Sequence, residues 1–300
     1  MKIVVTHCSP DWDAITSVWI IKRFLQNWEH AKIVFVPAGE RIKGSRANET
    51  QKTIEQIGED EVIHVDTGLG PLDHHQTSEM SVCGASRTWD YVKQQKADAG
   101  ERWLMKADAI ERIVSIIVGI DHFQEVYWDN PSADYHEFSL LGILEGLKYQ
   151  KPNEDEFYTL FGMECLDALL YDFENRAWAE KEISEKGKEF ETRYGKALGI
   201  ETMNDTVLKL AQKLGFSIVI RKDPRTGFVR IKTLPVHVGT KADNSPDFTL
   251  AYEKLSKMDP DATWYLHVSK KMLLNGTAKN PKMVPTRLTL SEIIEVIKQI

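Results

Sequence analysis

Three short apolar runs that alternate with helix-like segments constrain what the first part of this chain can fold into. The runs at Lys2–Thr6 (KIVVT), Lys32–Pro37 (KIVFVP) and Glu61–Asp66 are rich in β-branched residues, which is typical of strands. Apolar residues recur at helical spacing over Ala14–Trp28, and we expect a second, short helix at Glu49–Ile57. This order of elements, joined by short links, predicts an α/β fold in which a parallel sheet carries helices on both faces.

Polar residues gather directly after the first and the third predicted strand. The two clusters are His7, Asp11 and Asp13 after the first strand, and Asp66, Asp73, His74 and His75 after the third. Because the carboxyl ends of parallel strands meet at one edge of a sheet, we expect the two clusters to lie close together. A further pair, Asp121-His122, ends the apolar run Ile113–Ile120. The sequence therefore predicts one site that is built from three loops.

Mixed imidazole and carboxylate ligands suit manganese, iron or zinc better than calcium, which prefers oxygen ligands alone. Asp11 and Asp13 lie two residues apart at a helix start, so they point in different directions and each could serve a different ion. Asp66, from the neighbouring strand, could then bridge both ions. Two ions about 3.5–4 Å apart are the arrangement that hydrolyses phosphate esters and anhydrides.

Each of these residues has a simpler explanation when it is taken alone. An Asp at a helix start is more often a cap than a ligand, and Asp66-Thr67-Gly68 is ordinary turn chemistry. A single His, such as His7, is commonly a surface loop residue. Three separate loops that each end in Asp and His are hard to obtain from capping alone, so the set favours metal binding.

The same residues carry a resemblance to a known superfamily. THCSPDWDAITS at 6–17 resembles the first motif of the DHH phosphoesterases, VDTG at 65–68 looks like the second, and DHH at 73–75 is similar to the naming motif. Asp121, after an apolar helix, looks like the fourth. The chain thus resembles RecJ-like DHH hydrolases, and DHHQ at 73–76 resembles the melanocyte-proliferating-gene exonucleases of the same superfamily.

The resemblance implies a role for each residue of the site. One ion would be held by His7, Asp11 and Asp66, and the other by Asp13, Asp66, His74 and Asp121. The two divalent ions would most commonly be Mn²⁺, with Mg²⁺, Co²⁺ or Fe²⁺ as alternatives. Asp73 would orient a ligand histidine, and His75 would face the substrate as an acid or a phosphate ligand. The resemblance implies no role for His64 or His122.

The chain departs from the family pattern in three places. Ser9 stands where Asn is common, and Trp12 stands where a small or polar residue is frequent. Trp12 could narrow the pocket, stack on a base or simply pack. The glycine-rich GGGH-like signature of many relatives is absent, and the nearest substitute is a Gly with flanking Lys that could hold phosphate, or an ordinary loop. The candidate substrate-binding residues there are Asn275, Gly276 and Lys279.

The middle of the chain is mainly helical by its apolar spacing. We expect helices at Cys83–Gln95, Arg102–Gly119, Leu140–Tyr149 and Glu164–Tyr194, and the last is long and highly charged. The pattern changes at Gly199–Asn204, which we interpret as a domain boundary. The sequence leaves open whether the charged helix forms a homodimer face or only bridges the domains.

The pattern after this boundary is that of a small α+β domain. Strands are expected at Phe216–Arg221 and Phe228–Leu234 around a Pro- and Gly-containing turn, and Thr289–Glu292 matches a capping box before a terminal helix. We predict three parts: a DHH-type metal-binding α/β domain at 1–125, a helical cap or connector at 126–204, and a small α+β substrate-binding domain at 205–300.

Charge and cysteine content narrow the classes of partner. The net charge of −7 argues against a dedicated duplex-DNA binder or a nucleic-acid scaffold, which would show a basic face. Three cysteines without regular spacing argue against a zinc ribbon and fit a reducing compartment. The amino-terminal residues do not resemble a signal peptide, and no segment has the ~20 apolar residues that span a bilayer. We expect a cytoplasmic protein with no membrane partner.

These observations predict a metal-dependent phosphohydrolase. The preferred substrates are the phosphodiester bonds of short single-stranded oligonucleotides or nucleotides, with a 3′–5′ exonuclease as one form. An inorganic pyrophosphatase and a cyclic-dinucleotide phosphodiesterase, which act on phosphorylated small molecules, are the alternatives. A non-catalytic metal-binding regulatory module is the alternative of another class. Retention of His75 and of every candidate metal aspartate favours the enzyme.

Overall fold

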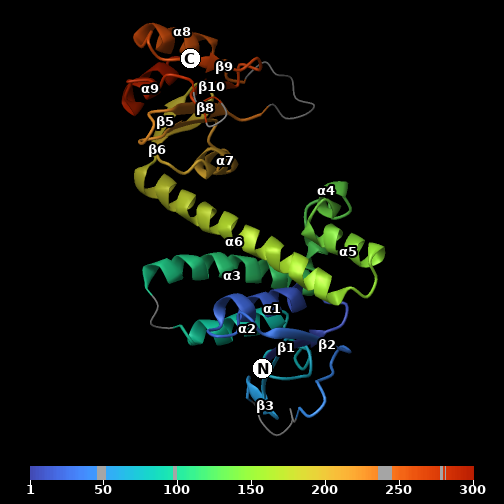
Figure 1. The fold of residues 1–300 in the computed structure, drawn as a ribbon. Helices are drawn as coiled ribbons and strands as arrows, with labels where there is room; N and C mark the ends of the chain where they lie inside the picture. The colour runs from blue at the N-terminus through green and yellow to red at the C-terminus, as the bar shows by residue number, and fades with distance from the viewer. Residues whose placement is uncertain (46–51, 97–99, 236–244, 278–279, 281) are drawn as a thin grey trace. The chain divides into compact units, whose positions relative to one another are not determined.

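The chain forms two compact units, Met1–Glu174 and Asn175–Ile300, in the computed structural model (Figure 1). The structure describes residues 1–45, 52–96, 100–235, 245–277, 280 and 282–300. Each unit has its own sheet and its own apolar core, so each is described by itself. All of the candidate metal ligands belong to the first unit.

The first unit contains a four-stranded sheet with the order β2-β1-β4-β3. β1 (Lys2–His7) is central and pairs in parallel with β2 (Lys32–Val36) and with β4 (Asp60–His64). The three strands expected from the apolar runs are therefore confirmed, together with their parallel pairing. Because β1 and β4 are neighbours and run the same way, the loops that follow them start from the same edge of the sheet.

β3 (Glu55–Ile57) pairs antiparallel with β4 at the edge of the sheet. A helix over Glu49–Ile57 was predicted here, and for residues 55–57 that prediction is wrong. Glu55 is buried at 7% exposure and forms an ion pair with Arg41, while Ile57 packs on the sheet, so tertiary contacts override the helical spacing. Residues 49–51 lie outside the described residues.

Helices cover one face of this sheet. Val4 and Ile63 point into the large core that α1 (Trp12–Phe24), α2 (Gly84–Gln94) and α3 (Glu101–Asp121) share. Their neighbours along the strands, such as Val5 and Val62, point the other way. Within the described residues, that second face packs against Ile42 and Ile57 and not against a helix. The predicted sheet with helices on both faces is thus found with helices on one face.

The segment after α3 consists of short elements followed by two longer helices. These elements are the 3₁₀ helix η1 (Gln124–Tyr127), α4 (Asp134–Glu137), α5 (Leu140–Gln150) and α6 (Asp155–Lys186). The predicted helices at 83–95, 102–119 and 140–149 are confirmed within two residues at each end. α6 begins nine residues before its predicted start and ends eight residues before its predicted end.

The end of α6 has a clear steric cause. A Cβ at Gly187 would lie 2.4 Å from the Ile183 carbonyl oxygen and 2.8 Å from Leu198, so only glycine fits where the chain leaves the helix. The chain then continues as β5 (Lys188–Thr192), which was predicted as helix. The division between the units falls between Glu174 and Asn175, inside α6.

The second unit contains a six-stranded sheet with the order β5-β6-β7-β8-β10-β9. β6 spans Gly195–Glu201, so the first half of the stretch interpreted as a domain boundary, Gly199–Glu201, belongs to a strand. β7 (Ile218–Lys222) and β8 (Val229–Thr233) form the predicted antiparallel hairpin. The remaining strands are β9 (Tyr265–Leu266) and β10 (Met272–Asn275).

The helices of the second unit are α7 (Thr206–Lys213), α8 (Thr249–Met258) and α9 (Leu290–Ile297). The predicted capping box at the start of α9 is present, with reciprocal hydrogen bonds between Thr289 and Glu292. Among the described residues, no helix has both the length and the apolar character needed to cross a bilayer.

Candidate metal centre

The first cluster lies at the turn from β1 into α1. Asp11 is the N-cap of α1, and its Oδ1 accepts a hydrogen bond of 3.0 Å from the Ala14 backbone N–H. The Asp11 side chain is 52% exposed. Asp13, the second residue of the helix, is only 2% exposed. The two carboxylates therefore point in different directions, as their spacing predicted.

Asp66 follows β4 with a backbone φ of 51°, in the left-handed region. Asp and Asn tolerate this conformation better than other residues that carry a side chain. The Asp66 backbone N–H donates to the Leu72 carbonyl oxygen over 3.0 Å, which closes the loop between them. Since Asp66 is only 2% exposed, the turn directs a carboxylate into the protein rather than into water.

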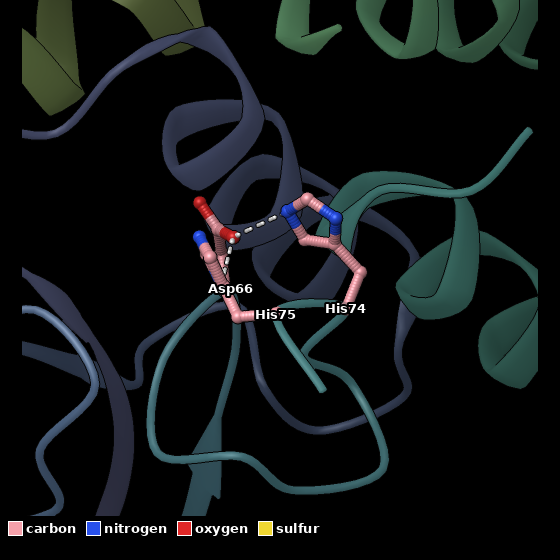
Figure 2. Close-up of side chains that lie close together, drawn as sticks. All are labelled: Asp66, His74 and His75. Atoms are coloured by element: carbon pink, nitrogen blue, oxygen red, sulfur yellow. Dashed lines mark ion pairs between the residues drawn. The ribbon is translucent and has the colours of Figure 1, made fainter. Parts of the chain in front are cut away.

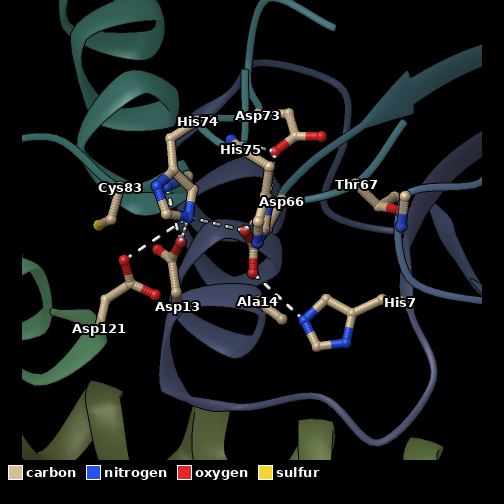
Figure 3. A network of polar contacts seen from close by, with 12 residues as sticks. His7, Asp13, Ala14, Asp66, Thr67, Asp73, His74, His75, Cys83 and Asp121 are labelled. Carbon is tan, nitrogen blue, oxygen red and sulfur yellow. Dashed lines mark hydrogen bonds and ion pairs between the residues drawn. The ribbon is translucent and has the colours of Figure 1, made fainter. Parts of the chain in front are cut away.

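One histidine nitrogen faces three carboxylates. His74 Nε2 lies 3.6 Å from Asp13 Oδ2, 3.6 Å from Asp66 Oδ1 and 3.5 Å from Asp121 Oδ2 (Figure 3). These residues come from α1, the loop after β4, the DHH segment and the end of α3. They are the four that the resemblance implies for one ion.

The second group forms on the other side of Asp66. His7 Nε2 lies 3.3 Å from Asp66 Oδ2 and 3.9 Å from Asp11 Oδ2. His7 Nδ1 is 2.8 Å from the Cys8 carbonyl oxygen, to which it can donate, and this leaves Nε2 as an acceptor or ligand. Candidate ligand atoms of His7, Asp11 and Asp66 lie within 4.8 Å of one another. Asp66 thus presents one oxygen to each group.

Burial disfavours the charged form of three carboxylates at the site. Burial raises the pKa of Asp13 well above its usual range, and the charge of Asp66 raises it further. Burial, and then the charge of Asp11, raise the pKa of Asp66 in the same way. Burial also raises the pKa of Asp121, against the influence of His74. A divalent ion would favour the ionised form of all three carboxylates.

Three polar atoms at this point lack hydrogen-bond partners among the described residues. They are Asp66 Oδ1, His74 Nε2 and Asp121 Oδ2, and each is buried. Unpartnered buried polar atoms are costly, yet here three of them converge on one point. The donor set, two histidine nitrogens and four carboxylates, suits manganese or iron and does not suit calcium. The residues therefore fit the two-ion site that the sequence predicts.

His75 and Asp73 form a pair next to this centre (Figure 2 shows His74, His75 and Asp66). His75 Nδ1 lies 2.7 Å from Asp73 Oδ1, and the His75 side chain is 55% exposed. Burial alone would raise the pKa of Asp73, but hydrogen bonds from the His75 ring and from backbone N–H groups outweigh it and lower the pKa. Asp73 was predicted to orient a ligand histidine. Its partner is His75 and not the candidate ligand His74.

No model of a known protein family matches this sequence, and no curated protein resembles it closely enough to count as a relative. We therefore argue the chemistry from the geometry of the site.

The amino terminus of α2 holds Asp13, which no local sequence signal indicates. The backbone N–H groups of Gly84 and Ala85 donate to the two oxygens of Asp13, each over 2.6 Å. The helix terminus thus stabilises a negative charge that burial disfavours. His122, which was given no role, lies beside the centre, and candidate ligand atoms of His122, Asp121 and His74 lie within 4.8 Å of one another. Its Nε2 is 2.9 Å from the Val82 carbonyl oxygen, an acceptor in the segment that leads into α2.

Gly84 is expected to be sensitive to substitution for a steric reason. A Cβ there would lie 2.8 Å from Asp66 Cβ and 3.0 Å from Asp13 Oδ2. Gly84→Ala should weaken Mn²⁺ binding and cost about 1–3 kcal/mol of unfolding free energy by overpacking. The matched control is Gly146→Ala in α5, where a Cβ meets open space and helix propensity improves. Urea unfolding and Mn²⁺ titration would measure both, and equal behaviour of the two variants would contradict the close packing.

A buried network holds the loop after β4. Arg41 Nη1 donates to the Gly68 carbonyl oxygen over 2.8 Å, and Arg41 also pairs with Glu55. Thr67 bridges the Gly39 N–H and the Glu40 carbonyl oxygen, at 3.1 Å each. This network spans residues far apart in sequence, so no local signal could have revealed it.

His64 is a packed residue of that network. Its Nε2 accepts from the Ile42 N–H over 3.2 Å. Burial, followed by the charge of Arg41, lowers its pKa to about 3, so the ring stays neutral near pH 7. Trp12 is also packed, at 5% exposure within the helical core, and this confirms the simplest of its three interpretations.

The candidate substrate-binding residues have internal roles. The Asn275 amide donates to the carbonyl oxygens of Thr263 and Val284 and accepts from the Thr286 N–H, and the residue is 0% exposed. A Cβ at Gly276 would lie 2.1 Å from the Phe228 ring, so this glycine serves packing. The Asn275 amide is thus engaged within the protein and Gly276 is buried, which corrects the prediction for these two residues. Lys279 lies outside the described residues.

Proposed function

We propose that this protein is a two-metal phosphohydrolase of the DHH type, with Mn²⁺ as its most suitable ion and Mg²⁺, Co²⁺ or Fe²⁺ as alternatives. The observation that carries the proposal is the position of Asp66. One of its oxygens lies 3.3 Å from His7 Nε2, and the other lies 3.6 Å from His74 Nε2. A carboxylate shared between two histidine–carboxylate groups is what a bridged pair of ions requires.

Two bound metal ions would supply an activated hydroxide and would stabilise the charge that develops on the phosphoryl oxygens. The residues of the chain do the rest. Asp13 is held in place by two backbone N–H groups at the terminus of α2, and His7 is oriented by its contact with the Cys8 carbonyl oxygen. Asp66 is fixed by a buried turn. These constraints are those of a preorganised site.

His75 is the residue best suited to move a proton. Its Nδ1 is engaged by Asp73, and the ring is more than half exposed, so Nε2 remains available to a substrate. In our proposal His75 binds a phosphoryl oxygen or protonates the leaving oxygen.

We infer that the substrates are phosphodiester bonds of short oligonucleotides or nucleotides, with 3′–5′ exonuclease action as one form. The support is the resemblance of DHHQ at 73–76 to exonucleases of the superfamily. Gln76 itself has an internal role, since its amide donates to the Gly70 and Asp73 carbonyl oxygens over 3.1 Å and 2.8 Å. Gln76 therefore shapes the loop that carries His74 and His75.

The proposal is tested by a panel of substrates with added Mn²⁺: short RNA, short DNA, a cyclic dinucleotide, bis-p-nitrophenyl phosphate and pyrophosphate. Cleavage of the oligonucleotides from the 3′ end would support our preferred form. Cleavage of pyrophosphate alone would replace it with a pyrophosphatase. Hydrolysis of none of them would overturn the enzyme and favour a metal-binding regulatory module.

His75→Ala should reduce turnover without removing the metal. We expect a loss of about 10²–10⁴-fold in kcat, the usual contribution of an acid or base, and nearly unchanged Mn²⁺ content. Metal analysis of the same samples used for kinetics would check this. His30→Ala, at an exposed position after α1, is the matched control. Parallel loss of metal and turnover would instead identify His75 as a ligand.

A further inference from the structure

The buried oxygen of Asp121 lacks the backbone support that Asp13 has. Asp13 accepts from two N–H groups at the start of α2, each over 2.6 Å. Asp121 Oδ2 is buried and has no hydrogen-bond partner among the described residues. Asp121 is also the last residue of α3, and the ends of helices open more readily than their interiors. Its position 3.5 Å from His74 Nε2 therefore depends on what holds the end of α3 in place.

His122, the next residue, ties this helix end to another part of the first unit. Its Nε2 lies 2.9 Å from the Val82 carbonyl oxygen, and its side chain is 13% exposed. Directly after it, Phe123 has a φ of 52°, in the left-handed region that a bulky residue rarely adopts. Backbone strain of this kind persists only where neighbouring contacts hold it. The hydrogen bond of His122 is such a contact, at the point where α3 ends.

The same hydrogen bond decides whether His122 can be a metal ligand. A carbonyl oxygen only accepts, so His122 Nε2 carries the proton that it donates to Val82. A ring nitrogen that carries a proton has no lone pair for a metal ion. This nitrogen is also the one that lies 3.8 Å from Asp121 Oδ2. His74 Nε2, by contrast, is free of such a bond within the described part of the chain. Proximity alone would count both histidines as ligands, whereas the hydrogen bonds separate them.

The segment 82–85 connects the two carboxylates that share one candidate ion. Its first residue accepts from His122, and its last two residues donate through their N–H groups to Asp13. Asp13 and Asp121 come from different helices, yet they lie 3.6 Å and 3.5 Å from the same histidine nitrogen (Figure 3). One short stretch of backbone therefore sets the position of Asp13 directly and that of Asp121 through His122.

We propose that His122 is a positioning residue of the metal centre and not a ligand. Through its bond to the segment 82–85 it fixes Asp121 relative to Asp13, so that both carboxylates meet the same ion. The effect on metal affinity rests on the proposed two-metal centre, whereas the link between α3 and the start of α2 does not. Residues that orient metal ligands typically change metal affinity by about 10–100-fold when they are replaced.

Two substitutions separate a positioning residue from a ligand. His122→Phe keeps a ring and removes the donor, whereas His122→Gln keeps an N–H donor at a similar reach. In calorimetric titrations with Mn²⁺, we expect His122→Phe to bind one of the two ions about 10–100-fold more weakly and His122→Gln to recover most of that affinity. Equal weakening in both variants would identify His122 as a ligand, and unchanged binding in His122→Phe would remove its role. Either result would overturn the proposal.

His136→Phe is the matched control for these titrations. His136 Nε2 also lies close to a backbone carbonyl oxygen, that of Asp129 at 3.0 Å. Among the described residues, His136 belongs to none of the groups that could hold a metal ion. Its replacement therefore removes an equivalent hydrogen bond away from the centre, and both Mn²⁺ ions should bind as in the unmodified protein. The same weakening in this control would show that the loss in His122→Phe is not specific to the centre.

The link itself is tested without metal, by hydrogen exchange of the Gly84 and Ala85 amides in the presence of a chelator. Loss of one hydrogen bond should speed this exchange by about two- to tenfold in His122→Phe and leave it unchanged in His122→Gln and His136→Phe. Equal exchange in all four proteins would overturn the link even if Mn²⁺ binds. If Mn²⁺ does not bind the unmodified protein, the proposed function and the effect on metal affinity fall together. Exchange in the metal-free protein then still decides whether His122 holds the end of α3.

Discussion

Replacing Asp66 with asparagine is expected to reduce Mn²⁺-dependent hydrolysis by about a thousandfold or more, at the upper end for loss of one electrostatic contact in an active site. The reason is that Asp66 faces both histidine groups, so one substitution removes charge from two places. We also expect calorimetry to show fewer than two bound Mn²⁺ ions per chain. Near-normal turnover, or an unchanged number of bound Mn²⁺ ions, would contradict the bridging role of Asp66.

Asparagine is the informative replacement because it separates charge from fold. The backbone of Asp66 has a φ of 51°, which asparagine adopts readily and alanine does not. Asp90→Asn, at an exposed position on α2, is the matched control and should keep full activity. Alanine at position 66 would confound loss of a ligand with strain in the turn.

The three parallel strands of the first unit could be predicted because each is marked by a local run of apolar residues. Runs such as Lys2–Thr6 are apolar and β-branched over their whole length, and in a parallel sheet such strands are buried on both sides. The helix prediction at Glu55–Ile57 was wrong because these residues form a tight antiparallel hairpin with β4, which follows them directly, and because Glu55 pairs with the sequence-distant Arg41. The predicted end of α6 was wrong because the space that Leu198 leaves at position 187, which is too small for a Cβ, depends on a residue outside the helix.

The grouping of the candidate site residues could be predicted from the sequence because of the sheet topology. Residues that end parallel strands must share an edge, so His7 and Asp66 could be placed together without knowledge of any side chain. The hydrogen bonds that hold the site residues in position could not be predicted from the sequence. Donation from α2 to Asp13 joins residues 71 and 72 positions apart, and the Arg41 network is equally non-local. The prediction that Asn275 and Gly276 bind substrate was wrong because a Gly with nearby Lys residues shows the same local sequence pattern whether it binds phosphate or only packs.

The second large effect concerns the stability of the metal-free protein. Because the pKa of Asp66 is raised in the folded state, the folded protein holds a proton that the unfolded chain has already released above about pH 4. The unfolding free energy that depends on this group therefore falls as the pH rises. Relative to Asp66→Asn, metal-free wild type should lose up to about 1.4 kcal/mol per pH unit over the interval in which only the unfolded chain is ionised.

The comparison with Asp66→Asn measures the Asp66 carboxylate together with its effect on Asp13, whose pKa it raises. Burial lowers the pKa values of His64 and His74, which makes stability rise with pH up to about 6.5, opposite in sign to the effect of Asp66. His64 does not contact Asp66, so its contribution cancels in the difference, whereas His74 lies 3.6 Å from Asp66 and its contribution is part of what the difference measures. Urea unfolding between pH 5 and pH 8 in the presence of a chelator measures the difference in unfolding free energy between wild type and Asp66→Asn. Tryptophan fluorescence suits this purpose, since Trp12, Trp19, Trp28, Trp89, Trp103 and Trp128 belong to the first unit. A difference that is independent of pH would contradict the burial of an acidic Asp66.

Adding Mn²⁺ should reverse the trend, because an ion that binds only the folded state stabilises it in proportion to its occupancy and favours the ionised carboxylates. At about a thousandfold excess over Kd, the gain is about 4 kcal/mol, or about 10 °C in the Tm of a unit of this size. The gain should increase with pH in the wild type, since the proton on Asp66 competes with the ion. It should be much smaller in Asp66→Asn at every pH. An equal gain in both proteins would place the ion away from Asp66, even if the protein proved to be a manganese-dependent hydrolase.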